Sequence, residues 1–482
     1  MMPITIPPID LLAVAPEIAV SGFACLLLMT AVFLKGKGGW VNACVALVGL
    51  AVAGWFALCQ GAPRSAYSGM YAADGFTQFF KIIFLLGTGL VVLVSVKYNE
   101  EENMNNGEYY ALLLFSTAGM MLMAAASDMM TLFLGLELLS ISLYVLAGYA
   151  RNRPGSNEAA LKYFLLGGFA VGFLLYGMAM IYGATGHTDF AGIGREAARG
   201  ADNRLYLVVG AVMLLTGLGF KVAAVPFHQW TPDVYEGAPI PVTAFMSAGP
   251  KAAVLAVMIR VYAQSVSFMH VDWLVWLSVL AVMTMTVGNV AALVQSDAKR
   301  MLAFSSISHA GYAMVGLAAA TREAVASVAV YMLVYTLMNI AVFGILALVA
   351  RKNEQRTKMR DFAGLARSNP VLAVSMTILV FSLAGIPPMA GFMAKFYVLM
   401  AAVKAGLYWL VLAAVLNSAV GIYYYLRFTV HMYMDEPEEK LPPVKASPAL
   451  VVAIALSIIG VLLIGVVPSA YLEMAGRAVV SF

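Results

Sequence analysis

Residues 217–239, GLGFKVAAVPFHQWTPDVYEGAP, place Lys221 five positions before Pro226 inside an otherwise apolar run. A proline removes a backbone donor and frees a carbonyl in the middle of a helix. In a bilayer such a break persists only where neighbouring protein or water satisfies the freed groups. This stretch therefore predicts a spanning helix that is broken beside a buried lysine.

Residues 382–399, SLAGIPPMAGFMAKFYVL, repeat the combination, with Pro387 and Pro388 before Lys395. Two Gly/Pro-interrupted spans in the two halves of a chain are typical of transporters built from inverted repeats. The second stretch therefore predicts a second broken helix and an internal repeat. The alternative is that the two proline kinks are unrelated.

The composition is that of a membrane protein. Of the 482 residues, 62% are hydrophobic and 11% are charged, whereas soluble domains carry about 25% charged residues. This excludes an ordinary soluble enzyme, a disordered segment and a nucleic-acid binder. The three cysteines lie in apolar runs without a CxxC pair, so we expect no disulfide framework, iron–sulfur cluster or c-type haem in this chain. The N-terminal residues lack a basic region and a cleavage site, so we expect no removable signal peptide.

A spanning helix needs about 20 mostly apolar residues, and fourteen such runs are present. They lie near 10–34, 40–60, 74–96, 108–126, 128–150, 158–184, 205–229, 239–263, 272–294, 300–320, 323–350, 370–402, 407–432 and 448–469. We therefore predict an all-α polytopic membrane protein with about fourteen transmembrane helices. The predicted units are helices 1–3 (1–107), a first five-helix repeat (108–263), a second, inverted repeat (272–434) and helix 14 with its tail (448–482).

The loops predict the orientation, because Lys and Arg gather on the cytoplasmic side. One set of loops holds 15 basic residues: Lys35, Lys37, Lys97, Arg151, Arg153, Lys299, Arg300, Arg351, Lys352, Arg356, Lys358, Arg360, Arg367, Lys440 and Lys445. The other set holds seven: Arg64, Arg195, Arg199, Arg204, Arg322, Lys404 and Arg477. The first set should be cytoplasmic. An even number of spans then places both termini outside, which is the periplasm in a bacterium.

Four charged residues lie deep in the predicted spans: Glu137, Lys221, Lys251 and Lys395. A charge near the bilayer centre costs at least roughly 2.5–3.5 kcal/mol and usually marks a functional site. The alternative is a buried ion pair that fixes helix packing, but three lysines cannot all pair with Glu137, the one carboxylate expected at this depth. Buried amines and carboxylates in general exchange protons near neutral pH. We therefore predict a proton relay.

Other polar residues in the spans leave more than one interpretation open. Lys162 either extends toward the membrane surface or takes up protons, and His228 and His309 are either relay groups or simply hydrogen-bonded. Metal binding is not expected, because no ligand spacing such as HxxxH occurs. Lys81 has no evident partner, and Arg260 and Arg427 are close enough to helix ends to extend into the interface. The tyrosines at 423–425 are expected to face lipid or to pack.

Four blocks together resemble the antiporter-like membrane subunits of respiratory complex I. They are LFLGLELLSISLYVLAGYA (132–150), residues 217–239, SDAKRMLAFSSISHAGY (296–312) and residues 382–399. They occur in the order of that family, and the resemblance covers nearly the whole chain. The resemblance implies fourteen helices in two inverted five-helix repeats, with helices 7 and 12 broken. It also implies proton pumping that is driven by electron transfer elsewhere in the complex.

The resemblance also implies a role for each buried residue. Glu137 matches the helix 5 glutamate, and Lys221, Lys251 and Lys395 match the lysines of helices 7, 8 and 12. Further matches are a helix 6 lysine on the uptake side, at Lys162, and histidines near a hydrated axis, at His228 and His309. The breaks are at Pro226, Pro387 and Pro388.

The resemblance implies partners, and rival functions remain open. No redox centre is expected in this chain; FMN and iron–sulfur clusters would lie in partner subunits, with NADH and quinone as substrates of the whole complex. The other partners would be antiporter-like and small membrane subunits in the bacterial inner membrane. The rivals are a subunit of a multisubunit cation/proton antiporter or membrane-bound hydrogenase, a stand-alone solute carrier, and a purely structural membrane subunit.

Overall fold

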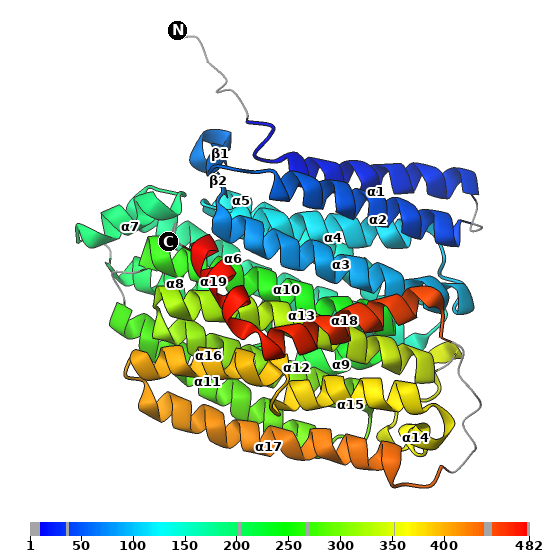
Figure 1. Cartoon of the computed structure of the whole chain (residues 1–482). Helices are drawn as coiled ribbons and strands as arrows, with labels where there is room; N and C mark the ends of the chain where they lie inside the picture. Colours follow the sequence, from blue (N-terminus) through cyan, green and yellow to red (C-terminus); the bar gives the residue numbers. More distant parts are fainter. Residues whose placement is uncertain are drawn as a thin grey trace.

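The computed structural model describes residues 10–34, 38–200, 204–266, 270–350, 352–437 and 446–479. Five of the basic loop residues used above lie outside the described residues: Lys35, Lys37, Arg351, Lys440 and Lys445. The described chain is a bundle of helices that run side by side along one axis (Figure 1). Hydrophobic side chains that face outward, such as Phe33, Phe169 and Val371, are 70–80% exposed, as expected of a surface that meets lipid.

Within the described residues, thirteen helices are long and apolar enough to cross a membrane. They are α1 (Ala15–Leu34), α2 (Gly39–Leu58), α3 (Gly75–Glu101), α4 (Gly107–Ala125), α5 (Met129–Ala147), α6 (Pro154–Thr185), α8 (Arg204–Val222), α10 (Ile240–Val261), α11 (His270–Leu293), α12 (Ala298–Ala319), α13 (Arg322–Ala350), α17 (Tyr408–Tyr433) and α18 (Pro448–Val466). The fourteenth predicted span, 370–402, is divided into α15 (Pro370–Ala384) and α16 (Ala390–Lys404). The predicted all-α membrane fold is confirmed.

Smaller elements join these spans. They are α7 (Phe190–Ala198), α9 (Trp230–Gly237), α14 (Leu365–Ser368), α19 (Pro468–Ala478), the hairpin β1 (Arg64–Ala66) and β2 (Tyr71–Ala73), and single turns at Tyr67–Gly69, Tyr262–Val266, Lys352–Glu354 and Met359–Phe362. The hairpin, α7 and α19 were not expected from the sequence. These segments are too short or too polar to register as spans.

Both helix breaks lie at the predicted prolines. The first separates α8 from α9, and the Trp230 indole donates to the freed carbonyl of Phe220 at 2.9 Å. The second separates α15 from α16, and α15 ends at Gly385 in the left-handed region (φ 85°). A glycine there is expected, because only glycine adopts this conformation without steric cost. At each break, side chains satisfy carbonyls that a continuous helix would have bonded.

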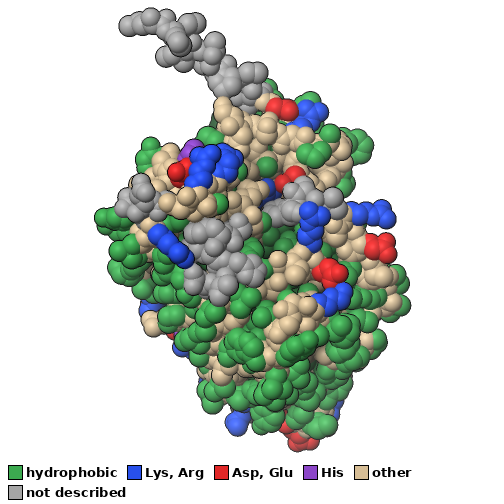
Figure 2. All heavy atoms as spheres, turned by 90° about the vertical axis from the view of Figure 1, so that its left-hand side faces the viewer, with side chains coloured by type: hydrophobic (Ala, Val, Ile, Leu, Met, Phe, Trp, Pro, Cys, Tyr) green, Lys and Arg blue, Asp and Glu red, His purple; other side chains and the backbone are tan. Residues whose placement is uncertain are grey.

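Both described ends of the chain lie at the same end of the bundle (Figure 1). Gln60, after α2, donates to the carbonyls of Leu12 and Ala13. Gly75, at the start of α3, lies against the backbone of Ala478. Figure 2 looks onto this end, where charged side chains are scattered and hydrophobic ones form much of the outline. An even number of membrane crossings explains the shared end.

The chain doubles back in the same way at two places. Asp128, before α5, is bridged to Asp189 after α6, and Asp297, before α12, is bridged to Lys358 after α13. Each aspartate caps the helix that follows it, and 169 residues separate both members of the first bridge from those of the second. The first bridge lies beside β2, near the termini, and the second lies at the opposite end of the bundle. The inverted repeats and the domain bounds stay a prediction, which this recurrence supports.

Glu354 joins both halves of the chain at the end opposite the termini. Its carboxylate is 7% exposed and accepts hydrogen bonds from Lys299 at 2.6 Å and from Arg153 at 3.1 Å. The backbone N–H of Ile240 at 2.9 Å and the Tyr98 hydroxyl also donate to it. Burial alone would raise the pKa of Glu354, but Lys299 and Arg153 outweigh burial and lower that pKa. Glu354 thereby ties α3, α6, α10 and α12 together.

The two arginines expected to extend toward the interface are held inside. Arg260 is 1% exposed and pairs with Asp74 at 3.0 Å, so that expectation is wrong for Arg260. Arg427 donates to the carbonyls of Leu293 and Gln295 at 2.7 Å and so caps the end of α11. Both guanidinium groups bind acceptors outside their own helices, which the sequence of one helix does not reveal.

Lys81 has a partner that the sequence did not reveal. Its amine is fully buried, 3.0 Å from Glu17 of α1 and 2.6 Å from the Tyr71 hydroxyl. Glu17 is 5% exposed, so Glu137 is not the only carboxylate buried within the spans. The pair joins α1 to α3 outside the predicted repeats.

Replacing Gly391 tests how closely the two half-helices pack at the second break. A Cβ at this position would lie 1.8 Å from the Ser382 carbonyl oxygen, which is the backbone of the other half-helix. Gly391→Ala should therefore destabilise the protein by at least the roughly 1–3 kcal/mol typical of overpacking. The matched control is Gly172→Ala in α6, where nothing lies within 4 Å. Thermal unfolding of the two purified variants measures the difference, and equal melting temperatures would show that the half-helices are not packed this closely.

Glu354→Gln tests the contact between the halves. Removing the carboxylate leaves Lys299 and Arg153 buried without a counter-charge, which should cost about 3–5 kcal/mol. Because the pKa of Glu354 is lowered, its contribution is present above the ordinary value and is lost as pH falls through the folded-state value. Melting temperatures at pH 7 should therefore fall for Glu354→Gln. Glu473→Gln, at an exposed pair with Arg477, is the control and should change little; the same small change in both would contradict the contact.

Candidate functional site

Lys251 lies at the centre of the bundle, on α10. Its side chain is 2% exposed. The amine donates to the Ser306 hydroxyl at 2.6 Å and to the Ser306 carbonyl at 2.8 Å. The serine of α12 thus supplies two oxygens to an amine that forms no ion pair within the described chain.

His309 follows Ser306 by one turn on α12 and is 3% exposed. Its Nδ1 lies 2.7 Å from the Tyr331 hydroxyl and its Nε2 lies 3.2 Å from the Tyr425 hydroxyl. Tyr425 is in turn hydrogen-bonded to Ser305. Both ring nitrogens therefore have hydroxyl partners, each of which can donate or accept a proton.

Lys395, on α16, is 8% exposed and lies beside the second break. Its amine donates to the carbonyls of Leu383 and Ala384 at 3.1 Å and to the Ser418 hydroxyl at 3.4 Å. The two carbonyls end the half-helix α15, whose negative dipole end favours a cation. The broken helix thus builds a site for the amine.

One face of α12 joins these two lysines. Ser306, His309 and Tyr312 are spaced three residues apart, so they share a face of the helix. Ser306 holds the Lys251 amine, and the Lys395 amine lies 4.8 Å from the centre of the Tyr312 ring. We call Lys251, Ser306, His309, Tyr312 and Lys395 the central track. It is a line of exchangeable groups that runs from α10 of the first predicted repeat to α12 and α16 of the second.

Lys221 and Glu137 lie in the first half and are not directly paired. The Lys221 side chain is 5% exposed and donates to the Tyr144 hydroxyl at 3.1 Å. Glu137 lies two turns before Tyr144 on α5 and has a buried oxygen without a protein hydrogen bond. No ion pair joins Lys221 to Glu137 in the described chain. Buried carboxylate oxygens are normally bonded to protein or water, so water is expected beside Glu137.

An aromatic wall separates Lys221 from Lys251. The Tyr163 and Trp230 rings stack at 4.6 Å, and Trp230 meets Tyr235 edge-on at 6.1 Å. Lys221 lies 5.4 Å from the centre of the Tyr163 ring, and Lys251 lies 6.0 Å from that of Tyr235. The described conformation therefore contains no chain of hydrogen bonds from one lysine to the other.

Lys162 belongs to an ion-pair network at the surface rather than to the buried line. Its side chain is 40% exposed, and its amine lies 2.8 Å from Asp233 of α9 and 2.7 Å from Glu158. Arg300 binds the other oxygen of Asp233 at 2.8 Å and also pairs with Glu236. The Asp233 carboxylate of α9 is thereby bound by Lys162 of α6 and by Arg300 of α12.

His228 lies in the first break, between α8 and α9. It is half-buried, and its Nδ1 has no hydrogen-bond partner in the protein. No hydrogen bond joins it to a lysine within the described residues. Its predicted place in the relay stays a prediction.

Several members of the site were not singled out from the sequence. Ser306 and Tyr312 stand in the block SSISHAGY, and their spacing around His309 was the available signal. The tyrosines at 423–425 were expected to face lipid or to pack. Tyr423 is 61% exposed, but Tyr424 and Tyr425 are 1% exposed. Both buried tyrosines pack in the core, which agrees with one of the two expectations, and Tyr424 also donates to Asn289 at 3.1 Å.

A metal would need a cluster of ligating side chains. In the parts of the chain that the structure describes, no group of three His, Cys, Asp or Glu residues could hold a metal ion. The imidazole and hydroxyl groups of the site can each donate or accept a hydrogen bond.

Known proteins resemble this chain in sequence and in fold. The family described as NADH:quinone oxidoreductase/Mrp antiporter, TM matches residues 126–421. A protein of Trichlorobacter lovleyi named NADH-quinone oxidoreductase subunit N is 50% identical and covers 98% of this chain and 97% of its own. Another of that name, from Chloroflexus aggregans, is 44% identical, with 99% of both chains covered.

Solved structures extend the comparison. A chain of respiratory complex I from Thermus thermophilus with bound aureothin matches with a TM-score of 0.80 and 33% identity, covering 94% of this chain and 98% of that one. A chain of the Mrp complex from Dietzia has a TM-score of 0.84 at 22% identity, with 96% and 97% covered. At that identity, the second match concerns the fold alone.

Ser306→Ala tests the central track. The Lys251 amine would keep the backbone carbonyl but lose the hydroxyl, and a hydrogen bond to a charged group is worth about 1.5–3 kcal/mol. We expect a severalfold lower rate of proton movement in vesicles that contain the assembled protein, measured with a pH-sensitive dye. Ser142→Ala is the control, because that hydroxyl bonds only to a carbonyl of its own helix. Equal rates in both variants would remove Ser306 from the track.

Proposed function

Because the chain belongs to the NADH:quinone oxidoreductase/Mrp antiporter transmembrane family, we propose that it is the proton-translocating subunit N of an NADH-quinone oxidoreductase. Its named relatives match over nearly the full length of both chains. In this role the chain moves protons while partner subunits carry electrons from NADH to quinone. It is part of an enzyme without carrying a redox centre of its own.

The proposal rests on three amines that are buried and form no ion pair in the described chain. Lys221, Lys251 and Lys395 are each at most 8% exposed, and none forms an ion pair in the described chain. A permanent charge at such a place is costly, whereas an amine that loads and releases a proton bears that cost only part of the time. A purely structural subunit gains nothing from three such groups.

The proposed route runs along the central track. A proton on the Lys251 amine passes to the Ser306 hydroxyl, which gives up its own proton toward His309. The imidazole then releases a proton toward Lys395, with the hydroxyls of Tyr331 and Tyr425 as its bonded neighbours. Water completes the intervals that no direct bond spans. Glu137 and Lys221 form the first half of the route, where the charge of one changes the proton affinity of the other.

Orientation and partners follow from the same assignment. The end of the bundle that carries Glu354 and most of the basic loop residues would face the cytoplasm, and both termini would lie in the periplasm of a bacterial inner membrane. Lys162, at the cytoplasmic end, would collect protons through its exposed ion-pair network. The partners would be other membrane subunits and the subunits that hold FMN and iron–sulfur clusters.

Lys395→Ala tests the proposal in the assembled complex. Without the amine, the track has no acceptor beside the second break, so NADH-driven proton pumping in vesicles should fall at least severalfold per NADH oxidised. Lys404→Ala is the matched control on the same helix, since that amine is exposed and pairs with Glu323 at the surface. Near-normal pumping per NADH by an intact Lys395→Ala complex would contradict the route.

Copurification separates the proposal from its rivals. The complex should contain flavin and iron–sulfur subunits, whereas a cation/proton antiporter would contain neither. A stand-alone carrier would purify without partners. Retention of NADH oxidation in the Lys395→Ala complex shows that the variant assembles, so a loss of pumping then reports on the relay.

A further inference from the structure

The turn that follows Lys221 has an uncommon backbone conformation. α8 ends one residue after this lysine, and the next residue, Ala223, lies in the left-handed region (φ 63°). Residues other than glycine rarely adopt this conformation, and it persists only where the surrounding structure holds it. Within the turn, the Ala224 N–H donates to the Gly219 carbonyl at 2.8 Å. The next amide, that of Val225, has its acceptor outside the turn.

The acceptor of the Val225 amide comes from a distant helix. The N–H donates to the Thr284 hydroxyl of α11 at 3.0 Å. Thr284 is fully buried and Val225 is 5% exposed, so the bond lies away from solvent. Buried backbone N–H groups are nearly always paired, because an unpaired one costs free energy comparable to a lost hydrogen bond. α11 lies in the second predicted repeat, so that repeat supplies an acceptor to the break in the first.

This use of a threonine differs from the common one. A threonine hydroxyl within a helix often bonds to a carbonyl one turn earlier in the same helix. Thr216 of α8 does so, since its hydroxyl donates to the Val212 carbonyl at 2.9 Å. The Thr284 oxygen accepts from a backbone amide that is 59 residues away along the chain. Thr284 therefore joins α11 to the turn between α8 and α9.

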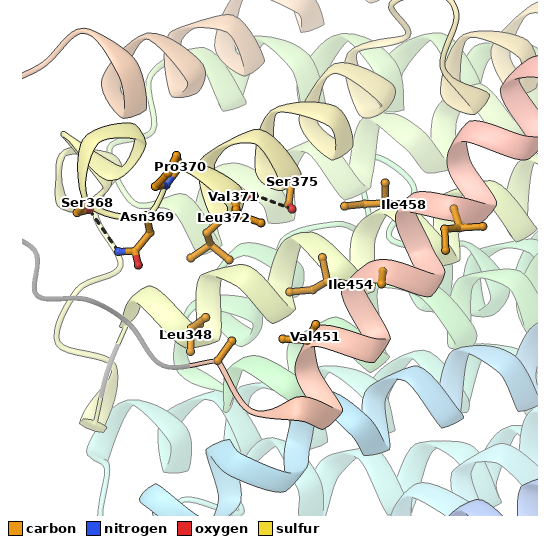
Figure 3. Close-up of a pocket in the computed structure, with 13 residues that line it drawn as sticks. Leu348, Ser368, Asn369, Pro370, Val371, Leu372, Ser375, Val451, Ile454 and Ile458 are labelled. Carbon is orange, nitrogen blue, oxygen red and sulfur yellow. Dashed lines mark hydrogen bonds between the residues drawn. The ribbon is translucent and has the colours of Figure 1, made fainter.

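The half-helices at the two breaks have different surroundings. The start of α15 borders an open groove of about 560 Å³, which it shares with α13 and α18 (Figure 3). The wall of the groove is mostly aliphatic, and Val371 on its rim is 80% exposed. The turn at the first break is enclosed, and both Ala223 and Ala224 are fully buried. A single hydrogen bond from α11 can therefore hold this turn without competition from solvent.

We propose that Thr284 is a positioning residue for the relay. Its hydroxyl fixes the turn after Lys221 and so keeps the lysine amine at the Tyr144 hydroxyl, 3.1 Å away. Lys221 lies two residues before the left-handed Ala223, so a turn that relaxes redirects the end of α8 and the lysine with it. Thr284 takes no part in proton transfer and acts through the backbone. The inference rests on the proposed function, because it takes Lys221 to belong to the proton route.

Thr284→Val tests the bond, because valine has nearly the shape of threonine but no acceptor. Hydrogen–deuterium exchange of the purified complex is followed by mass spectrometry with fragmentation that resolves single amides. The Val225 amide should exchange at least about fivefold faster in Thr284→Val, since exchange reports local loss of hydrogen bonds. Thr284→Ser keeps the oxygen and should exchange like the unaltered complex. Equal exchange of this amide in Thr284→Val and in the unaltered complex would overturn the proposal.

Proton pumping separates a positioning role from a packing role. Misplacement of a reacting group by about 1 Å is costly, so pumping per NADH oxidised in vesicles should fall at least about threefold in Thr284→Val and return in Thr284→Ser. Thr216→Val is the matched control on the helix of Lys221, since that hydroxyl bonds to its own helix, and should change neither readout. Faster exchange of the Val225 amide with unchanged pumping in Thr284→Val would rule out the positioning role.

A second variant and an independent readout keep the test decisive. Thr284→Ala removes the same oxygen without adding volume and replaces Thr284→Val if that variant does not assemble. Retained NADH oxidation shows assembly. The exchange of the Val225 amide does not depend on proton transport. Normal pumping by the Lys395→Ala complex would therefore contradict the proposed function, whereas unchanged exchange at Val225 would contradict only the role of Thr284.

Discussion

Three amines must be kept inside a bilayer without permanent counter-charges, and this constraint explains much of the structure. Lys221, Lys251 and Lys395 take their hydrogen-bond acceptors from a tyrosine, a serine and two backbone carbonyls. Neutral oxygens stabilise a charged amine less than a carboxylate would. Each amine can therefore lose its proton without leaving a buried anion behind. A salt-bridged site such as Lys81–Glu17 lacks this freedom and serves as a fixed contact between helices.

The broken helices leave backbone carbonyls free to accept hydrogen bonds from side chains. An unbroken helix uses its interior carbonyls for its own hydrogen bonds, so a lysine that binds one there, as Lys251 binds that of Ser306, has to share it with the helix. Ending α15 at Ala384 leaves carbonyls free at the centre of the bundle, where Lys395 binds them. At the first break, the Trp230 indole takes the corresponding carbonyl instead, and Lys221 turns to Tyr144. The freed carbonyls thus accept from an indole at the first break and from a lysine at the second. The two lysines therefore have different surroundings.

Periodic and compositional features could be predicted from the sequence, and contacts between distant segments could not. Apolar runs fixed the spans, prolines marked both breaks, and the depth of Lys251 and Lys395 followed from their positions within the runs. The partner of Lys81 lies 64 residues away and that of Arg260 lies 186 residues away, so neither pattern nor propensity could reveal them. Tyr425 looked like a packing residue because its role depends on His309 of another helix. Lys162 lies eight residues after the start of α6, and its partner Asp233 is on the short helix α9, which the sequence did not reveal.

The aromatic wall lies between Lys221 and Lys251, the two buried lysines of the first predicted repeat. The stacked faces of Tyr163 and Trp230 offer no exchangeable proton, and no hydrogen bond joins Lys221 to Lys251 in the described chain. The short helix α9, which is eight residues long and follows the first break, carries Trp230. Its Asp233 is held by Lys162 from one half and by Arg300 from the other. These ion pairs are partly exposed, so they are weak enough to exchange partners. Trp230 begins α9 and Asp233 lies one turn later, so the aromatic wall and the surface ion pairs are built on the same short helix.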